Sequence, residues 1–269
     1  MELLSPANPR IHAAALLRGR RARDEGGLTL VDGGRELLRA IDAGAAVESL
    51  FVRRAGLRTP DARRAVERLA HAGVETIECS PAAFEKVAYG DRDEGVVAVV
   101  RTPRAELADL RLPAEPLVVV TEDVEKPGNV GAILRSADGA GADAVIAADR
   151  RTDLFNPNVI RASVGTVFSV PVARATADDA RRWLDAHGVR VVAARVDAET
   201  LYTDADLTGP VALVLGSEAS GLSAAWDGAD VEAVRLPMLG LADSLNVSVT
   251  AAVLLYEARR QRGPRRSGD

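Results

Sequence analysis

Three blocks in the second half of the chain place polar side chains directly after apolar runs. They read Asn129-x-Gly131-x-x-x-Arg135, then Leu215-Gly216-x-Glu218-x-x-Gly221-Leu222-Ser223, then Leu236-Pro237-Met238 followed by Ser244-Leu245-Asn246-Val247-Ser248. A loop that leads into a polar helix start offers backbone N–H groups and side-chain oxygens, which together can cradle a small molecule. Each block alone also fits a capped helix, a glycine turn or a proline-bounded loop, so the hypothesis of a binding site depends on all three.

The elements before these blocks place them at one edge of a sheet. Residues 117–121, 211–215 and 231–236 are apolar runs typical of buried strands, and helical spacing begins near residue 130. Open α/β sheets bind ligands at the carboxyl ends of their parallel strands. The order of strands and blocks therefore predicts one shared binding site at that edge.

The third block leads into a long helix. Asp243 or Ser244 is expected to cap it, because their side-chain oxygens suit the free N–H groups of a first turn. Helical spacing predicts one buried stripe along it, made of Leu245, Val249, Ala252, Val253 and Tyr256. We expect that stripe to pack in the core or at a dimer interface.

The remaining segments alternate between strand and helix patterns, which indicates an α/β protein. In the first half, expected strands lie at residues 28–31, 48–52, 74–78 and 95–100, with helices at 36–41, 61–72 and 81–87. The second half adds expected strands at 143–147, 166–172 and 189–195 and a helix at 178–187. The expected division is an N-terminal domain over residues 1–104, a proline-containing linker over 105–116 and a second domain over 117–269.

Arginines are concentrated near the start of the chain. Those between residues 8 and 23 are Arg10, Arg18, Arg20, Arg21 and Arg23. Arginine forms bidentate hydrogen bonds to phosphate oxygens, so this cluster could bind phosphate groups. A solvated helix face is an equally good interpretation, because nearly all basic residues of the chain are arginine and their number alone carries little weight.

Composition excludes several classes of protein. The 269 residues are 47% hydrophobic and 27% charged, as in globular proteins, and no apolar run reaches the roughly 18 residues of a membrane span. Cys79 is the only cysteine, which excludes intrachain disulfides and cysteine zinc sites. The net charge of −5 argues against indiscriminate nucleic-acid binding but allows a local basic patch. The first residues lack a signal-peptide layout, so a cytoplasmic location is expected.

Three further kinds of site lack the motifs they require. No Gly-x-x-x-x-Gly-Lys-Ser/Thr sequence occurs, which excludes a P-loop nucleotide site. The run Gly139-Ala-Gly141-Ala-Asp-Ala144 lacks the third glycine of a dinucleotide fingerprint and follows a helix pattern. The histidines lie in separate segments without the spacing of metal ligands, so no metal site is expected.

In their order and spacing, the three blocks resemble the motifs of the SpoU-type (TrmH-like) RNA ribose 2′-O-methyltransferases of the SPOUT superfamily. The resemblance covers roughly residues 115–262, and the segment from Arg161-Ala-Ser163-x-Gly165 to Phe168-Ser-x-Pro171 also fits. The N-terminal half is more loosely similar to that family's small ribosomal-protein-like RNA-binding domain, through Asn8 and Gly33-Gly34-Arg35-Glu36. Asp32 stands near the place where the family usually has a glutamate, which is a departure from its pattern.

The resemblance implies a fold, a cofactor and an assembly. The fold is an α/β parallel sheet with a deep trefoil knot, an exception to the rule that chains do not knot. The cofactor is S-adenosylmethionine, held mainly by backbone groups around Gly216, Leu236, Met238 and Leu245. The assembly is an obligate homodimer whose active sites are completed across the interface.

The resemblance also implies catalytic roles. Arg135 takes the position that activates the ribose hydroxyl with help from an RNA phosphate. Because a guanidinium stays protonated, Arg135 could instead clamp the phosphate and stabilise a developing alkoxide. Asn129 would orient Arg135 or the ribose, and Glu218 would hold an arginine or a loop. Ser244 and Asn246 would position the hydroxyl and the ligand.

Arg161 is a second candidate for contact with phosphate or ribose, beside Arg10, Arg18, Arg20 and Arg21. The separate N-terminal domain favours ribosomal (23S) RNA as the substrate, with transfer RNA as the alternative. A non-catalytic RNA-binding protein of the same fold is the other alternative. The intact set of polar residues in the three blocks argues against it.

Overall fold

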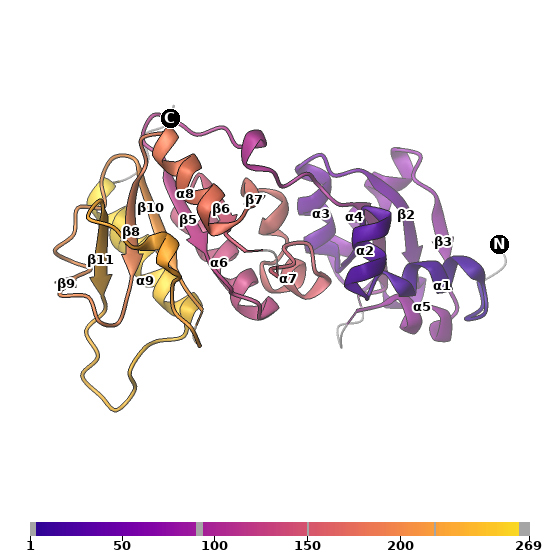
Figure 1. The fold of residues 1–269 in the computed structure, drawn as a ribbon. Helices are drawn as coiled ribbons and strands as arrows, with labels where there is room; N and C mark the ends of the chain where they lie inside the picture. The colour runs from indigo at the N-terminus through magenta and orange to yellow at the C-terminus, as the bar shows by residue number, and fades with distance from the viewer. Residues whose placement is uncertain (1–3, 90–93, 150, 218, 264–269) are drawn as a thin grey trace. The chain divides into compact units, whose positions relative to one another are not determined.

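The computed structural model describes residues 4–89, 94–149, 151–217 and 219–263 (Figure 1). The chain divides into two compact units, and each is described by itself. The first unit contains the residues up to Pro103 together with Asp153–Ser169. The second contains Arg104–Thr152 and the residues from Val170 onward. The first unit is therefore assembled from two stretches that lie far apart in the sequence.

The first unit is built on a small mixed sheet. Its strands lie in the order β1 (Leu28–Asp32), β4 (Val96–Arg101), β2 (Val47–Val52), β3 (Thr76–Glu78). Strand β4 is antiparallel to both β1 and β2, whereas β3 is parallel to β2. The strands predicted from the sequence are confirmed here. Every residue of β4 except Arg101 is buried, and Val97 and Val99 pack in one apolar core with Leu30 and Phe51.

Helices surround this sheet. They are α1 (Pro9–Leu16), α2 (Arg20–Gly26), α3 (Gly34–Asp42), α4 (Pro60–His71), α5 (Pro81–Val87) and α7 (Pro157–Ala162), with 3-10 turns η1 (Arg54–Gly56) and η3 (Thr166–Phe168). Several begin with a capping side chain followed by proline, as at Asn8, Thr59 and Ser80. The arginine-rich stretch is two helices, because the backbone is extended at Gly19, which precedes α2.

The second unit contains a parallel sheet. Its strands lie in the order β7 (Val172–Arg174), β6 (Ala144–Ala147), β5 (Leu117–Thr121), β10 (Val211–Leu215), β8 (Arg190–Ala194), β11 (Val231–Arg235), β9 (Thr200–Leu201). Every neighbouring pair is parallel. The predicted parallel α/β sheet is thus confirmed, and the fully buried faces of β5 and β10 explain why both read as continuous apolar runs.

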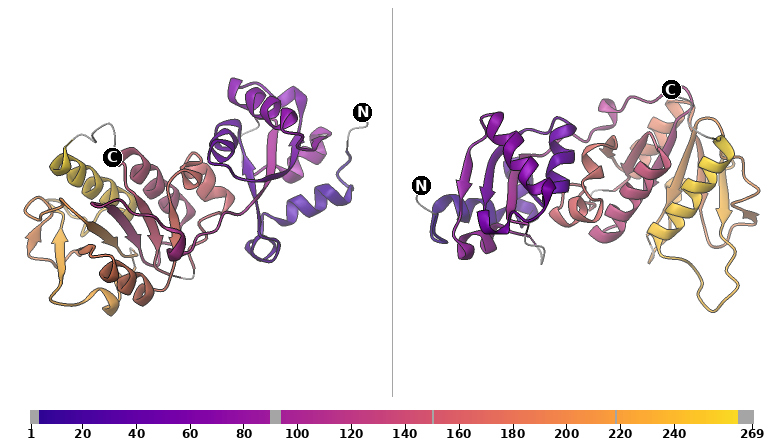
Figure 2. Two further views of the ribbon diagram at one scale, coloured as in Figure 1. Left: turned by 90° about the horizontal axis from the view of Figure 1, so that it is seen from above. Right: turned by 180° about the vertical axis from the view of Figure 1, so that it is seen from behind.

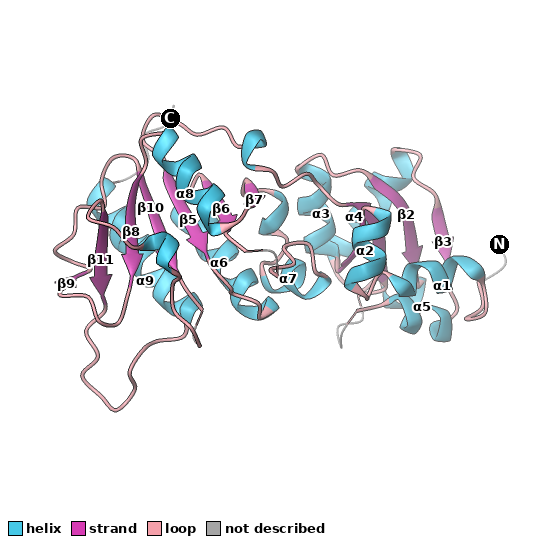
Figure 3. Ribbon diagram, in the orientation of Figure 1, coloured by secondary structure: helices cyan, strands magenta, loops and turns pink. Residues whose placement is uncertain are grey.

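Helices cover both faces of the parallel sheet. Helices α6 (Pro127–Ala140) and α9 (Val247–Arg262) pack side by side on one face, and α8 (Ala177–Ala186) lies on the other (Figures 2 and 3). Short 3-10 turns complete the unit, η2 (Leu107–Asp109) and η4 (Ala224–Trp226). Among the residues that the structure describes, no helix combines the length and the apolar character needed to cross a membrane.

The strand predicted at residues 166–172 is wrong over most of its length. Thr166–Phe168 forms the 3-10 turn η3, and the strand β7 begins only at Val172. Gly165 has φ +81°, which starts a turn rather than a strand. The turn is then held by side-chain hydroxyls, since Thr166 Oγ1 donates to Ser163 O at 3.0 Å and Ser169 Oγ donates to Thr166 O at 3.1 Å.

Helix α9 differs from its prediction in both cap and face. Its N-cap is Asn246, whose Oδ1 accepts from Ser248 N at 3.0 Å, and not Asp243 or Ser244. The buried face consists of Val247, Ala251, Leu254, Leu255 and Ala258. From the predicted stripe, Leu245, Val249 and Tyr256 are 37%, 46% and 55% exposed. Both sets have helical spacing, so periodicity alone cannot choose between them.

Candidate functional site

A cavity of about 740 Å³ opens at the carboxyl edge of the parallel sheet. Its walls come from the segments that follow strands β8, β10 and β11, and from the first turn of α9. In Figure 1 the arrowheads of β8 and β11 point to the end of the sheet where the long loop between β11 and α9 lies. The cavity therefore lies at the edge of the sheet where the sequence predicted a binding site.

The predicted cofactor residues all line this cavity. They are Gly216, Leu236, Met238 and Leu245. Leu215 and Leu222 add further apolar surface, and Arg195, Asp197, Arg235 and Asp243 add charge at its walls. A volume in the range of about 300–1,000 Å³ is usual for small-molecule sites. The wall here combines apolar side chains with several charged and hydroxyl-bearing ones. The residues present thus suit a small molecule that has both apolar and polar parts.

The turn after β10 forms one wall and requires glycine at residue 216. A Cβ added to Gly216 would lie 2.2 Å from the carbonyl oxygen of Gly221, so the backbone approaches too closely for any side chain. Ser217 fastens the turn, since its Oγ accepts from Ser220 N at 3.1 Å and its carbonyl accepts from Gly221 N at 3.0 Å. Glu218, a predicted catalytic residue, lies outside the described residues.

The first and third sequence blocks meet through two asparagines. Asn246 Nδ2 donates to Asn129 Oδ1 at 3.1 Å, which joins the start of α9 to the start of α6. Ser248 Oγ also donates to Asn246 Oδ1 at 2.7 Å, beside the cap bond from its own N–H. Ser244, another predicted residue, lines the cavity. The structure thus brings Asn129, Asn246 and Ser244 to the same edge of the sheet.

Arg135 stands apart from this group. It is exposed on α6 and does not line the cavity, and its guanidinium makes no hydrogen bond or ion pair within the described ranges. The structure therefore leaves its guanidinium available to an external anion. Its predicted catalytic role stays a prediction.

Two buried carboxylates that the sequence analysis did not single out shape the loops at this edge. Glu122, 7% exposed, accepts from Ser223 N at 2.8 Å and Ser223 Oγ at 2.7 Å, which ties the end of β5 to the turn after β10. Asp149 accepts from the N–H groups of Asp123 and Thr152 at 3.1 and 2.6 Å. The sequence feature that could have identified both residues is an acidic residue just after an apolar strand run.

The predicted RNA-binding arginines all lie in the first unit, and most have partners there. Arg10 pairs with Glu75, Arg20 with Asp24 at 3.3 Å, and Arg21 with Glu25 at 2.7 Å, all on the surface. Arg18 donates only to backbone carbonyls of Glu85 and Ala88. Arg161 Nη1 donates to Tyr89 O at 2.7 Å.

Arg23, from the same cluster, is buried. Its guanidinium donates to the carbonyls of Leu17 and Arg18 at 2.9 and 2.8 Å and pairs with Asp153. Its role is therefore structural. Across the described ranges, no group of three or more histidine, cysteine or acidic side chains is arranged to hold a metal ion.

Comparison with known families matches nearly the whole chain. Residues 116–256 match the SpoU rRNA Methylase family, and residues 8–98 match the MRM3-like substrate binding domain. A 23S rRNA (uridine(2479)-2′-O)-methyltransferase from Streptomyces viridochromogenes is 33% identical over 260 residues, which are 92% of this chain and 88% of that protein.

Solved structures of RNA methyltransferases are also similar to this chain, over the residues of both units. An RNA 2′-O ribose methyltransferase crystal structure is 43% identical, with a TM-score of 0.86 and coverage of 97% of this chain and 99% of that chain. An AdoMet-bound rRNA methyltransferase from Sinorhizobium meliloti is 30% identical, with a TM-score of 0.87 and coverage of 97% of both chains.

Proposed function

The chain belongs to the SpoU rRNA methylase family, and from this premise we propose that it transfers a methyl group from S-adenosylmethionine to a ribose 2′-hydroxyl of ribosomal RNA. The observation that carries the proposal is the cavity at the carboxyl edge of the sheet. All four residues expected to hold the cofactor line it, and the asparagine pair lies at the same edge. Ribosomal RNA is preferred to transfer RNA because the first unit matches a substrate binding domain.

The cavity suits S-adenosylmethionine. The cofactor supplies a methyl group on a positively charged sulfonium. Leu236, Met238 and Leu245 would pack against its adenine, and backbone groups beside Gly216 would bind its edges. Ser244 would bind the polar tail or the ribose hydroxyl.

The polar residues at the edge would position the ribose. Asn246 holds the Oδ1 of Asn129, so the two amides form one fixed unit. Arg135 would bind the phosphate next to the target ribose and stabilise negative charge on the 2′-oxygen as its proton leaves. A guanidinium is not a base at neutral pH, so Arg135 acts electrostatically and the proton goes to water or to the phosphate.

The enzyme would act as a homodimer. Leu245, which precedes the cap of α9, and Val249 and Tyr256 on the helix are exposed apolar side chains, and a second copy of the chain would cover them. Because Arg135 does not line the cavity of its own chain, it would serve the site formed with the partner. Tyr256→Arg should convert dimer to monomer in analytical ultracentrifugation. An unchanged dissociation constant of the dimer would contradict this assembly.

Two further expectations of the family resemblance belong to the proposal. The segment after β11 would thread through a loop to form a trefoil knot, which fits the close packing of α9 on α6. The enzyme would work in the cytoplasm, where its ribosomal RNA substrate is made.

Methyl transfer is tested with radiolabelled S-adenosylmethionine and transcribed 23S rRNA or transfer RNA. Label in the 23S rRNA, mapped to one ribose, is expected. Label in transfer RNA alone would favour that substrate, and no label with intact cofactor binding would favour a non-catalytic RNA-binding protein. Arg135→Ala should lower kcat by about 10²–10³-fold while calorimetry gives unchanged cofactor binding. Arg182→Ala, which removes an exposed arginine of α8, is the matched control.

A further inference from the structure

Tyr89 in the first unit has a partner at each of its polar groups. Its N–H donates to Asp32 Oδ2 at 2.5 Å, its carbonyl accepts from Arg161 Nη1 at 2.7 Å, and its hydroxyl accepts from Asn158 Nδ2 at 3.2 Å. The side chain is only half-buried. A partly exposed aromatic ring is thus fixed at both its backbone and its far end.

Arg18 lies over the face of this ring, with its guanidinium carbon 5.9 Å from the ring centroid. It is exposed and makes no ion pair with a carboxylate of the described residues. Arg10, Arg20 and Arg21 differ, because each is neutralised by an acidic partner. Arg18 is therefore the member of the predicted arginine cluster whose charge is least compensated.

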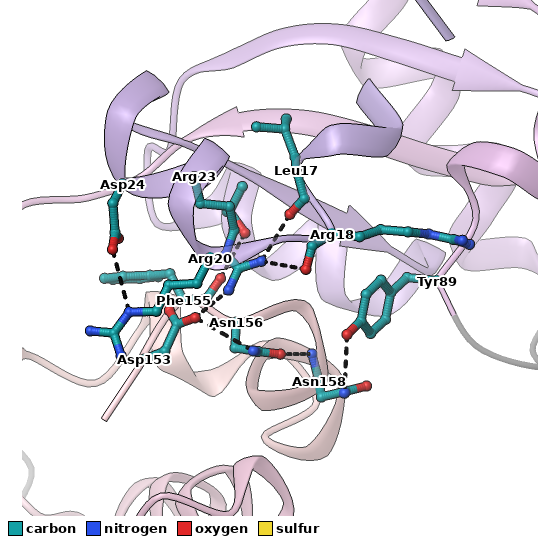
Figure 4. Close-up of polar contacts among 11 residues, drawn as sticks. Leu17, Arg18, Arg20, Arg23, Asp24, Tyr89, Asp153, Phe155, Asn156 and Asn158 are labelled. Carbon is teal, nitrogen blue, oxygen red and sulfur yellow. Dashed lines mark hydrogen bonds and ion pairs between the residues drawn. The ribbon is translucent and has the colours of Figure 1, made fainter. Parts of the chain in front are cut away.

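Asn158 adds an exposed amide beside the ring. It lies in the first turn of α7, and its N–H donates to Asn156 Oδ1 at 2.9 Å, which fixes the backbone there. In Figure 4 the Tyr89 ring lies between Arg18 and the amide of Asn158. Ring, cation and amide come from three separate segments of the chain, all within the first unit.

We infer that Tyr89, Arg18 and Asn158 form a binding site for one unpaired nucleotide of the RNA substrate. This inference rests on the proposed function, since it places a second RNA contact on the same enzyme. Proteins bind unpaired bases by stacking them on aromatic rings and guanidinium planes and by hydrogen bonds to the base edges. Here the ring and Arg18 supply the stacking surfaces and the phosphate charge, and the amide of Asn158 supplies donors and an acceptor.

The fixed geometry of the three residues favours nucleotide binding over a purely structural role. A ring that is immobile before binding loses little entropy when a base stacks on it. A paired base in a duplex cannot reach such a surface, because its faces are already stacked on its neighbours. The site would therefore select single-stranded or bulged RNA over duplex RNA.

The test compares binding of fluorescein-labelled single-stranded rA12 and rU12 with binding of the rA12–rU12 duplex to the full-length protein. Tyr89→Ala should weaken single-strand binding by about 5- to 150-fold, the range for loss of one base stack, and leave duplex binding unchanged. Arg18→Ala should weaken single-strand binding and reduce its dependence on salt. Tyr202→Ala, which alters a half-buried tyrosine of the second unit, is the matched control.

Tyr89→Phe separates stacking from structural support. It keeps the ring and loses only the hydroxyl bond to Asn158, so its affinity should stay within about twofold of the wild type. Equal loss in the Phe and Ala variants, or no single-strand preference in the wild type, would overturn the inference. Methyl transfer to 23S rRNA with an unchanged KM in Tyr89→Ala would overturn it too and leave the proposed function intact. Single-strand binding that depends on Tyr89, without any methyl transfer, would support the inference and contradict the proposed function.

Discussion

Replacing Asp32 by asparagine is expected to change how the stability of the first unit depends on pH. Burial raises the pKa of Asp32 to about 7, although the hydrogen bond from Tyr89 N–H and the charge of Arg161 both lower it. The negative charges of Glu94 and Glu36 raise this pKa further. Asp32 thus takes up a proton on folding at weakly acidic pH.

The sign and size of the effect follow from this shift. An unfolded aspartate titrates near pH 3.9, so between about pH 4 and pH 7 the folded state binds one proton more than the unfolded state. The stability of the first unit therefore falls as pH rises through that window, by at most about 1.4 kcal/mol per pH unit. Three pKa units correspond to about 4 kcal/mol in total, an upper limit. Asparagine keeps an oxygen for Tyr89 N–H and has no proton to gain.

The measurement must report on the first unit alone. Both tryptophans, Trp183 and Trp226, lie in the second unit, so tryptophan fluorescence would follow the wrong part of the chain. Hydrogen exchange of peptides from β1 and β4, corrected for the intrinsic exchange rate at each pH, gives the opening free energy of the first unit. Peptides from β10 provide the internal reference.

The expected result is a steeper pH dependence for the wild type than for Asp32→Asn between pH 4.5 and 7. The two curves should become parallel above pH 8, where the carboxylate is ionised in both states. Parallel curves across the whole range would show that Asp32 does not change protonation on folding. The structural account of its burial beside Tyr89 would then be refuted.

Two further substitutions test the proposed cofactor and ribose sites. Gly216→Ala should weaken S-adenosylmethionine binding by at least about tenfold in calorimetry, because the new Cβ meets the Gly221 carbonyl and the turn must open. Gly240→Ala is its control, since nothing lies within 4 Å of the added Cβ there, and equal loss in both variants would contradict the prediction. Ser248→Ala removes one hydrogen bond to Asn246 and should lower kcat by about 2- to 12-fold, with activity kept in Ser248→Thr. An unchanged kcat in Ser248→Ala would show that the orientation of Asn246 does not limit turnover.

The strands and the position of the cavity could be predicted because local patterns determine them. Runs such as Leu117–Thr121 and Val211–Leu215 are buried on both faces, so their sequences are apolar throughout. Polar residues directly after such runs must gather at one edge when the strands are parallel. Gly216, Met238 and Ser244 meet at the cavity for this reason, although they come from separate loops.

The orientation of α9 could not be predicted, because it depends on partners distant in sequence. Its sequence offers two apolar stripes with the same spacing, and packing on α6 buries the one that contains Leu254 and Leu255. The cap at Asn246 is chosen by a bond to Asn129, more than a hundred residues earlier in the chain. Such choices are made by tertiary contacts, which a single sequence does not reveal.

The arginine cluster shows that the burial and the ion-pair partners of charged residues also depend on tertiary contacts. Its members are alike in sequence, yet Arg23 is buried and pairs with Asp153. Of the other four arginines between residues 8 and 23, Arg18 alone lacks a carboxylate partner in the described residues. Asp153 lies far beyond residue 104, so a fragment ending there would leave Arg23 buried without its counter-charge. Removing one partner of a buried pair costs about 3–5 kcal/mol. The same fragment would lack Asn158 and Arg161, which hold the Tyr89 hydroxyl and carbonyl. The nucleotide site proposed in the first unit therefore depends on residues 153–169, which lie within the part of the sequence that matches the SpoU family.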